Sequence, residues 1–416
     1  MMCDADDPVE MTGQAVIVRQ PIFTRDKDIW GYELLSSGSV EHDVASELTL
    51  SEVVRDYRNY ISSLPSPIAG KKILMRVSDS LRVTADDAIC GEECAFWFDP
   101  KMVDHPGYES LVQELSRDGG TLVMEDSLDP SRADLFRGGV IIRVSLAEKT
   151  PPEIVNIRNK FKGIDCDFLA VDVDSWEAFE GSRALGFSYF QGPFFSLPET
   201  ETATSLPANS VSKLKLLREL GNPDCEVNVL ADIISSDISL SYRILKYMNS
   251  ASLGIRNKIT SIAQAVSLLG LNEVRHWSMV VVMTDLDSTP RGEELSYLAL
   301  QRGRFLNKLA ESMPNLELDP DTMFLLGLFS KLDALLSCPM EQALKHILLD
   351  DRIKDALCGR LNEFRDWLLL LQAVEIGHWK EANEILVRYG ACLTRTATQY
   401  MQASSWAAKL LPELTH

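Results

Sequence analysis

The first half of the chain alternates short apolar runs with longer amphipathic segments. The apolar runs are rich in Val, Ile, Phe and Tyr, and several are nearly continuous, which is typical of strands buried on both faces. Strands that alternate with helices predict a mostly parallel sheet, either a closed barrel or an open doubly wound sheet. The predicted strands are 16–23, 73–77, 95–98, 121–124, 140–144, 168–173 and 189–195, and the predicted helices are 44–63, 107–118, 151–162 and 175–186.

The pattern changes near residue 197, where the stretch 197–207 is polar, bounded by prolines and poor in bulky apolar residues. Such a composition predicts a linker. Beyond it, apolar positions recur with helical spacing almost throughout, so the second half is predicted to be all-helical. Its later helices are predicted at about 293–312, 321–336, 340–348, 363–376, 379–389 and 394–411.

Residue types that cap helices occur at suitable places in this second half. Asp237 is a good N-cap for an amphipathic helix, and Ser261 with Gln264 has the pattern of a capping box. Gly270 is predicted to end that helix, and Asn272 is predicted to cap the one that follows.

Charge and composition restrict the partners and the compartment. The 416 residues carry a net charge of −20, so repulsion from phosphate groups disfavours broad nucleic-acid binding. The chain has no run of about 18 apolar residues, and its acidic N-terminus lacks a signal-peptide pattern. We therefore expect a cytoplasmic protein without membrane insertion. Cys90 and Cys94 are four residues apart, but no histidine or second cysteine pair accompanies them, so reduced thiols are expected instead of a zinc site.

Three segments of the first half resemble EAL domains: RQPIF at 19–23, GYELL at 31–35 and GFSYFQGP at 186–193. The resemblance implies that this half is a degenerate EAL domain, which is a TIM-like barrel. Active EAL enzymes hydrolyse cyclic-di-GMP with two divalent cations, which are held by carboxylates and one Asn at the C-terminal ends of strands. That chemistry requires several oxygen ligands close together.

Several positions of this motif set differ from the family pattern. Arg76 stands at the Asn position, where its charge would repel Mg²⁺, and Arg143 stands at the position of the catalytic Lys. Arg remains protonated and is bulkier than Lys, so it is a poor replacement for orienting water. Val171 replaces a Glu and Ser145 replaces an Asp. We therefore expect no catalytic residues and no Mg²⁺ or Mn²⁺ site. The candidate ligand-binding remnants of the EAL site are Glu33, Glu125, Asp126, Arg143, Asp174 and Gln191.

The second half resembles HDOD domains, all-helical relatives of the HD phosphohydrolases, through LLREL at 216–220, LSYRILKYMNS at 240–250 and ITSIAQAVSLLG at 259–270. HD enzymes bind metal through a His-Asp doublet. The matching position here is Ser330-Lys331, so the resemblance implies that this second metal site is also lost. His276 is interpreted as the polar edge of an amphipathic helix.

Both halves together resemble the EAL–HDOD (YuxH-type) bacterial signalling proteins. The expected division is an acidic tail over 1–14, the barrel over 15–198, a linker over 199–210 and the HDOD domain over 211–416. The resemblance implies a non-catalytic role related to cyclic-di-GMP, in which binding of protein partners regulates motility, pili, biofilm or virulence. Two alternatives stay open: a sensor that binds cyclic-di-GMP without hydrolysis, and a weak metal-dependent phosphodiesterase. No cofactor is expected, although cyclic-di-GMP is a possible ligand.

Overall fold

The chain folds as two compact units in the computed structural model, Ala15–Phe195 with Glu375–Gly377, and Ser196–Val374 with His378–His416. The predicted tail 1–14, the predicted helix 44–63 and most of the predicted linker 199–210 lie outside the described residues. The structure describes residues 16–36, 70–77, 93–104, 107–117, 119–131, 139–147, 149–199, 208–222, 226–249, 259–345 and 347–415.

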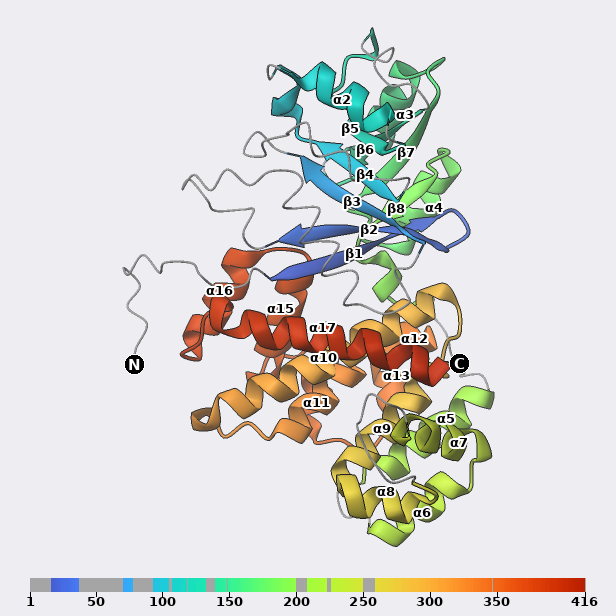
Figure 1. Cartoon of the computed structure of the whole chain (residues 1–416), viewed down its shortest axis with the longest axis vertical. Helices are drawn as coiled ribbons and strands as arrows, with labels where there is room; N and C mark the ends of the chain where they lie inside the picture. Colours follow the sequence, from blue (N-terminus) through green and yellow to red (C-terminus); the bar gives the residue numbers. More distant parts are fainter. Residues whose placement is uncertain are drawn as a thin grey trace. The chain divides into compact units, whose positions relative to one another are not determined.

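The first unit is a barrel, as Figure 1 shows. Within the described residues, eight strands close in chain order, so the structure selects a barrel over an open sheet. Strand β1 is antiparallel to both of its neighbours, β2 and β8, whereas β2 to β8 run parallel to one another. The strands are β1 (Ile17–Thr24), β2 (Ile29–Ser36), β3 (Lys72–Val77), β4 (Cys94–Phe98), β5 (Thr121–Glu125), β6 (Val140–Ser145), β7 (Cys166–Val171) and β8 (Tyr189–Gln191).

Two strands differ from the sequence-based prediction. Strand β2 carries the GYELL motif but was not among the predicted strands, and the register of its pairing with β1 shifts at Trp30. The predicted strand 189–195 ends instead at Gln191, because Pro193 has no backbone N–H for the ladder and begins a 3₁₀ turn over Pro193–Ser196. Gly192 lies so close to the backbone of Val173 that a Cβ atom would not fit there.

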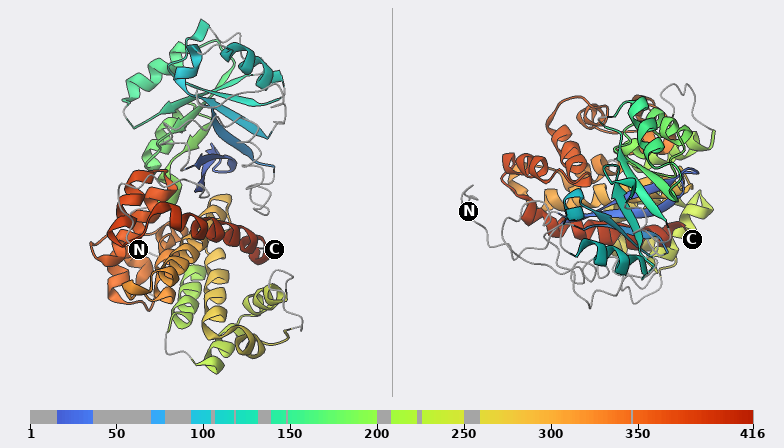
Figure 2. Two further views of the ribbon diagram at one scale, coloured as in Figure 1. Left: turned by 60° about the vertical axis from the view of Figure 1, so that its left-hand side comes forward. Right: turned by 90° about the horizontal axis from the view of Figure 1, so that it is seen from above.

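Apolar side chains fill the middle of the barrel, and helices α2 (Tyr108–Arg117), α3 (Pro151–Lys160) and α4 (Trp176–Ala184) lie outside it (Figure 2). Since side chains alternate along a strand, residues two positions further on face the interior at the next level. At that level, which is the rim formed by the C-terminal ends of β2 to β8, the interior-facing residues include the polar side chains of Arg76, Glu125 and Arg143. The apolar cluster consists of Ile22, Leu74, Ala95, Val123, Ile141, Leu169 and Val171.

The second unit is helical. Helix α10 packs against both α11 and α17. Gly327 on α11 permits this contact, because a Cβ atom there would lie 2.5 Å from the carbonyl carbon of Arg302 on α10. The helices are α5 (Ala208–Leu220), α6 (Val227–Ser235), α7 (Ile238–Met248), α8 (Ile262–Leu269), α9 (Leu271–Thr284), α10 (Pro290–Ser312), α11 (Pro320–Phe329), α12 (Leu332–Leu336), α13 (Met340–Leu344), α14 (Asp351–Leu357), α15 (Glu363–Glu375), α16 (Trp379–Arg388) and α17 (Leu393–Thr415). None of these helices is long and apolar enough to cross a membrane.

Most of the predicted helix caps are confirmed. Asp237 caps α7 by accepting a backbone N–H hydrogen bond at 3.0 Å, and Ser261 caps α8 in the same way at 3.1 Å. Gly270 ends α8 with a φ of 93°. The predicted N-cap role of Asn272 is wrong: because Gly270 turns the chain at once, α9 begins one residue before Asn272.

The predicted helix 321–336 is two helices, with a break between α11 and α12. At the break, the hydroxyl of Ser330 donates a hydrogen bond of 2.6 Å to the carbonyl of Gly327. The same hydroxyl accepts a hydrogen bond of 3.0 Å from Arg302. The side chain therefore satisfies a carbonyl at the end of α11, which allows the helix to stop there.

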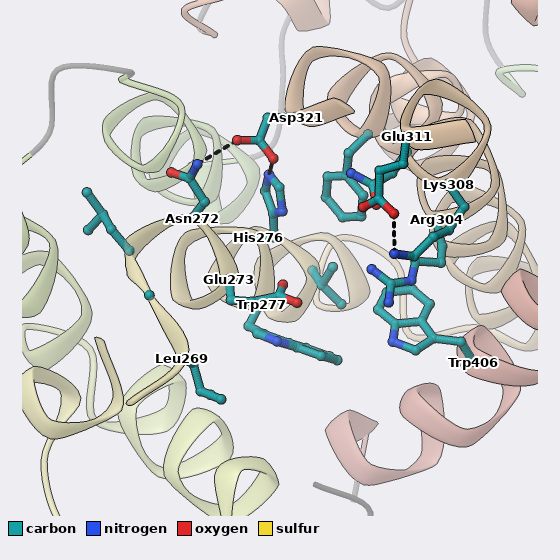
Figure 3. Close-up of a pocket in the computed structure, with 15 residues that line it drawn as sticks. Leu269, Asn272, Glu273, His276, Trp277, Arg304, Lys308, Glu311, Asp321 and Trp406 are labelled. Atoms are coloured by element: carbon teal, nitrogen blue, oxygen red, sulfur yellow. Dashed lines mark hydrogen bonds and ion pairs between the residues drawn. The ribbon is translucent and has the colours of Figure 1, made fainter. Parts of the chain in front are cut away.

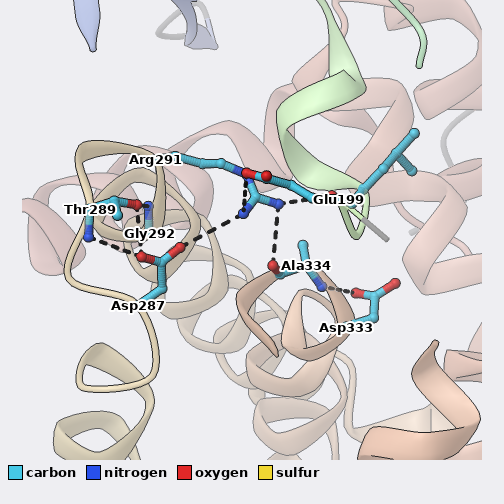
Figure 4. A network of polar contacts seen from close by, with 8 residues as sticks. Glu199, Asp287, Thr289, Arg291, Gly292, Asp333 and Ala334 are labelled. Carbon is cyan, nitrogen blue, oxygen red and sulfur yellow. Dashed lines mark hydrogen bonds and ion pairs between the residues drawn. The ribbon is translucent and has the colours of Figure 1, made fainter. Parts of the chain in front are cut away.

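The segment just after the barrel is held within the helical unit by Arg291, near the start of α10 (Figure 4). Its side chain is only 4% exposed. One guanidinium nitrogen donates to the carbonyls of Leu197, at 2.8 Å, and Ala334, at 3.2 Å. The other lies 3.6 Å from a carboxylate oxygen of Glu199 and 3.7 Å from one of Asp287. This network ties three separate parts of the unit together.

Candidate functional site

Trp97 on β4 lies at the centre of the polar level of the barrel, and two arginine guanidinium groups lie over its ring, one from the adjacent strand β3 and one from β6. The Arg143 guanidinium lies 4.0 Å from the centre of the Trp97 ring, and the Arg76 guanidinium lies 4.8 Å from it. Arg143 is paired in register with Glu125 on the adjacent strand. We refer to Arg76, Trp97, Glu125 and Arg143 as the rim layer.

Each arginine of the rim layer forms an ion pair. Arg143 Nη1 lies 2.9 Å from Glu125 Oε1, with the two side chains 17% and 19% exposed. Arg76 Nη2 lies 2.5 Å from Asp99 Oδ2. Although burial acts in the opposite direction, the backbone N–H of Lys101 and the Arg76 guanidinium hold the pKa of Asp99 below its ordinary value. Asp99 is therefore an anion that is already compensated by this chain.

The predicted site residues Glu33 and Gln191 meet inside the barrel. Glu33 is 3% exposed and accepts a hydrogen bond of 2.5 Å from Gln191 Nε2. The same amide nitrogen donates to Gln20 Oε1 at 2.9 Å. Gln20 was not predicted, although it lies in the RQPIF segment and pairs in register with Glu33. The buried carboxylate of Glu33 is therefore hydrogen-bonded to the side-chain amide of Gln191 on β8.

Two lysines contact the next predicted residue, Asp126, one at its carboxylate and one at its backbone carbonyl. Lys149 Nζ lies 3.0 Å from Asp126 Oδ2, and Lys160 Nζ donates to the Asp126 backbone carbonyl at 2.7 Å. Neither lysine belongs to the EAL motif set, so motif comparison gave no signal for them. Both lie between β6 and β7 in the chain, and this location is the sequence feature that could have suggested them.

Asp174 is not joined to the other predicted residues. It is exposed, and its carboxylate accepts a hydrogen bond of 3.0 Å from the neighbouring Ser175. Asp172 lies at the end of β7 instead, with a φ of 57°, and accepts a hydrogen bond of 2.5 Å from Ser145 on β6. Ser145 at the family's Asp position is therefore used to bind a carboxylate of this chain.

These side chains, as they are placed, do not fit a centre of two divalent cations. Glu125, Asp126 and Asp99 each face a cationic side chain, and Glu33 is bonded to an amide. Mg²⁺ prefers near-octahedral oxygen coordination, so several of these contacts would have to break to admit it. Across the parts of the chain that the structure describes, no three His, Cys, Asp or Glu side chains gather in a way that could hold a metal ion.

The position of the His-Asp doublet in the helical unit has a different chemistry. Ser330 is bonded to Arg302 and Gly327, as described above. Lys331 precedes α12, and Asp333 lies in the first turn of that helix. Burial raises the pKa of Asp333 from its ordinary value, against the opposing effect of Lys331. At the position that the sequence resemblance assigns to the His-Asp doublet, the structure therefore places a hydroxyl and a lysine.

Comparison with known proteins finds a family match in the helical unit and relatives along almost the whole chain. The HDOD domain family matches residues 206–356. The "Uncharacterized protein YuxH" of Bacillus subtilis strain 168 is 27% identical over 418 residues, which cover 95% of this chain and 98% of YuxH. The "Cyclic di-GMP phosphodiesterase CdgJ" of Vibrio cholerae is 25% identical over 419 residues, covering 94% of this chain and 92% of CdgJ. An HDOD domain therefore follows the barrel, and the predicted EAL–HDOD order is confirmed.

Solved structures are similar to either half. The PaMucR phosphodiesterase in complex with c-di-GMP aligns with a TM-score of 0.33 and 14% identity, over 43% of this chain and 94% of that one. A putative phosphohydrolase from Shewanella amazonensis aligns with a TM-score of 0.39 and 14% identity, over 51% and 94% of the two chains.

Proposed function

We propose that this chain, an EAL-type barrel followed by an HDOD domain, is a non-catalytic signalling protein of a cyclic-di-GMP pathway that acts by binding other proteins. The observation that carries the proposal is the internal pairing of the rim carboxylates, above all Glu125 with Arg143. The similarity to CdgJ, whose name describes a cyclic-di-GMP phosphodiesterase, supports the pathway.

A metal ion at the rim would have to separate Glu125 from Arg143 and Asp99 from Arg76. Arg143 cannot lose its proton at any accessible pH, so its positive charge stays beside Glu125. A divalent cation at Glu125 would be repelled by that charge in a partly buried site, where such interactions are strong. Arg76 has the same effect at Asp99. Two arginines therefore oppose the metal centre that hydrolysis of a phosphodiester would need.

A hydrolysis assay tests the proposal against the competing hypothesis of a weak phosphodiesterase. The purified full-length chain is incubated with cyclic-di-GMP and either Mg²⁺ or Mn²⁺, and the linear product is quantified. We expect no turnover above the rate of a Glu33→Ala variant. Turnover that Glu33→Ala abolishes would overturn the non-catalytic role.

The binding role has its own test. A pull-down from the host cell, with the whole chain as bait, identifies protein partners, and we expect their contact surfaces to be basic or mixed because this chain carries a net charge of −20. Deletion of the gene is expected to alter motility, pili, biofilm or virulence. Specific binding of random duplex DNA at physiological salt would contradict the expected class of partner.

One observation favours a second candidate function, binding of cyclic-di-GMP without hydrolysis. The Arg76 side chain is 53% exposed while its guanidinium lies over Trp97, so this guanidinium, although paired with Asp99, is accessible to a ligand at the rim. Calorimetry with about 100 µM cyclic-di-GMP, enough to saturate a micromolar site, measures this directly. Binding that is lost in Arg76→Ala and kept in the surface variant Arg183→Ala would support a sensor, and the absence of heat would exclude it.

A further inference from the structure

A pocket of about 470 Å³ lies in the helical unit, between the start of α9 and helices α10, α11 and α17 (Figure 3). Its volume is in the range that holds one small molecule. Asp321 and Phe324 line it from the first half of α11. Ser330, at the HD metal position, follows the other end of this ten-residue helix, six residues beyond Phe324 and therefore about 9 Å further along its axis. The pocket is therefore separate from the remnant of the HD site.

One wall of the pocket presents an uncompensated cation. The Arg304 guanidinium lies 5.3 Å from the centre of the Trp406 ring. Among the residues that the structure describes, none forms a hydrogen bond or an ion pair with Arg304. Lys308, one turn further along α10, is instead paired with Glu311 at 2.5 Å. A partly buried guanidinium without a counter-ion favours the binding of a carboxylate or phosphate, and planar oxyanions suit its fork of donors.

The floor of the pocket is aromatic. Trp277 and Trp406 have their ring centres 5.5 Å apart, and His276 stacks on Phe324 with centres 4.2 Å apart. Trp277 is further supported from behind by Tyr247, at 4.0 Å. Such faces bind flat rings well, because stacking on an aromatic side chain adds to the burial of apolar area.

The opposite end of the pocket presents hydrogen-bond acceptors. In Figure 3, Asn272 and Asp321 lie on one side, and Arg304 with Lys308 lies on the other. Asn272 Nδ2 donates to Asp321 Oδ2 at 2.6 Å, and Asp321 Oδ1 faces His276 Nε2 at 3.7 Å. The side-chain oxygen of Asn272 is available on this side, and each carboxylate oxygen of Asp321 can accept a further hydrogen bond. Glu273 lines the same pocket from the first turn of α9. Carboxylate and amide oxygens at this end would accept hydrogen bonds from ring amino or imino groups.

We propose that this pocket binds a nucleoside monophosphate, with the phosphate on Arg304, the base against Trp277 and Trp406, and the edge of the base toward Asp321 and Glu273. The three kinds of group that line the pocket, a guanidinium without an ion-pair partner among the described residues, two adjacent tilted indoles and acceptor oxygens, match the three parts of such a ligand. The site is independent of the barrel, so its existence does not depend on the signalling role proposed above.

The test is calorimetry on the full-length chain with AMP, GMP, CMP and UMP as probes. We expect at least one to bind and to raise the melting temperature of the protein. Arg304→Gln should weaken binding about tenfold or more, since a charge-assisted hydrogen bond is lost. Trp406→Leu should weaken it similarly, whereas Arg360→Gln, which alters an exposed pair with Asp355, should leave it unchanged.

Two further ligands test whether both the base and the phosphate contribute to binding. The corresponding nucleoside and inorganic phosphate should each bind more weakly than the whole nucleotide. Arg304→Lys keeps a charge and provides a second variant if Arg304→Gln does not fold, which circular dichroism reports. No binding of any of the four nucleotides at about 1 mM, where even weak sites fill appreciably, would overturn the proposal. Unchanged affinity in Arg304→Gln, or equal affinity for phosphate alone, would overturn it as well.

Discussion

Arg143 in the barrel and Arg304 in the helical unit occupy similar surroundings with different consequences. Each guanidinium lies over a tryptophan ring, at 4.0 Å from Trp97 and at 5.3 Å from Trp406 respectively. Arg143 also has a carboxylate within 2.9 Å, and the described part of the chain offers none to Arg304. The same arrangement of arginine and tryptophan is therefore neutralised by Glu125 in the barrel, whereas in the helical unit it remains able to bind an anion.

A third arginine extends the comparison. Arg291 is more buried than either, with its guanidinium shared among two carbonyls and two carboxylates. If the contribution of an arginine to the free energy of unfolding depends on the number of partners of its charge, replacing Arg291 should destabilise the protein most and replacing Arg304 least. Methionine is a suitable replacement in all three cases, because it keeps the apolar stem and removes the charge.

The largest effect is expected for Arg291→Met. It leaves the buried carbonyl of Ala334, the partly buried carbonyl of Leu197 and the carboxylates of Glu199 and Asp287 without their donor, so the helical unit should lose about 4 kcal/mol of stability. Urea unfolding followed by far-ultraviolet circular dichroism measures the loss. The control is Arg360→Met, whose pair with Asp355 is exposed and should be worth less than about 1 kcal/mol. Equal effects of the two substitutions would contradict the ranking.

A smaller loss, about 2 kcal/mol, is expected for Arg143→Met in the barrel, since Glu125 becomes an unpaired and largely buried anion. The measurement is the same unfolding experiment, with hydrogen exchange of the backbone amides of β5 and β6 as the probe of the barrel. Arg183→Met, in an exposed pair with Glu180, is the matched control and should have little effect. A gain of Mg²⁺ binding in Arg143→Met would further show that the guanidinium is what excludes the cation.

The pH dependence of the helical unit should depend on His276. Burial and the nearby Arg275 and Arg304 lower the pKa of this imidazole to about 4, while Asp319 opposes them. In the unfolded chain the pKa is about 6.5, so the unfolded state takes up the proton first as the pH falls. The associated stability is present above about pH 6.5 and is lost between there and pH 4, by about 1.5 kcal/mol between pH 7 and pH 5.

The contribution of His276 is isolated by comparing the pH dependence of stability in the wild type and in His276→Gln, because many carboxylates titrate in the same range. Asp321, whose Oδ1 lies 3.7 Å from His276 Nε2, is one of them, and burial raises its pKa. The loss of stability from pH 7 to pH 5 should be smaller in His276→Gln than in the wild type. The exposed control His378→Gln should behave as the wild type does. An unchanged pH dependence in His276→Gln would mean that the histidine is not buried in the neutral form.

The smallest effect on stability is expected for Arg304→Met, less than about 0.5 kcal/mol, because no partner of its charge is left unpaired. Thermal unfolding without added nucleotide measures this. A loss as large as that for Arg143→Met would reveal a structural role for Arg304 and remove the contrast between the rim layer and the pocket.

Much of the fold could be predicted because the signals are local. The apolar runs that became β3 to β7 and the helical stripes that became α10, α15 and α16 were identified to within a few residues. Strand β2 was missed because it is buried on both faces over Gly31–Leu34 and its register shifts at Trp30, which removes the alternating pattern. His276, interpreted as the polar edge of a helix, has a side chain only 13% exposed, because Phe324 from another helix covers it.

The candidate sites were predictable only in part. The motif comparison identified Glu33 and Gln191, which the structure brings together, and Asp174, which it leaves apart from the others. It did not identify Lys149, Gln20 or Trp97, since none of these belongs to the metal-binding motif. The pocket was not predicted at all, because its lining residues come from five helices, α8, α9, α10, α11 and α17, and no single segment of the chain contains its pattern.

The sequence by itself determined the residue types, such as Arg76, Arg143 and Ser330-Lys331 at the positions that the resemblance assigns to metal ligands and catalytic residues. It also determined the order of strands and helices, because hydrophobic periodicity acts over a few residues. Only the tertiary structure decided which charges are compensated. Coulomb energy depends on distance in space and on burial, and so Glu125 meets an arginine 18 residues away while Arg304 meets no carboxylate among the described residues.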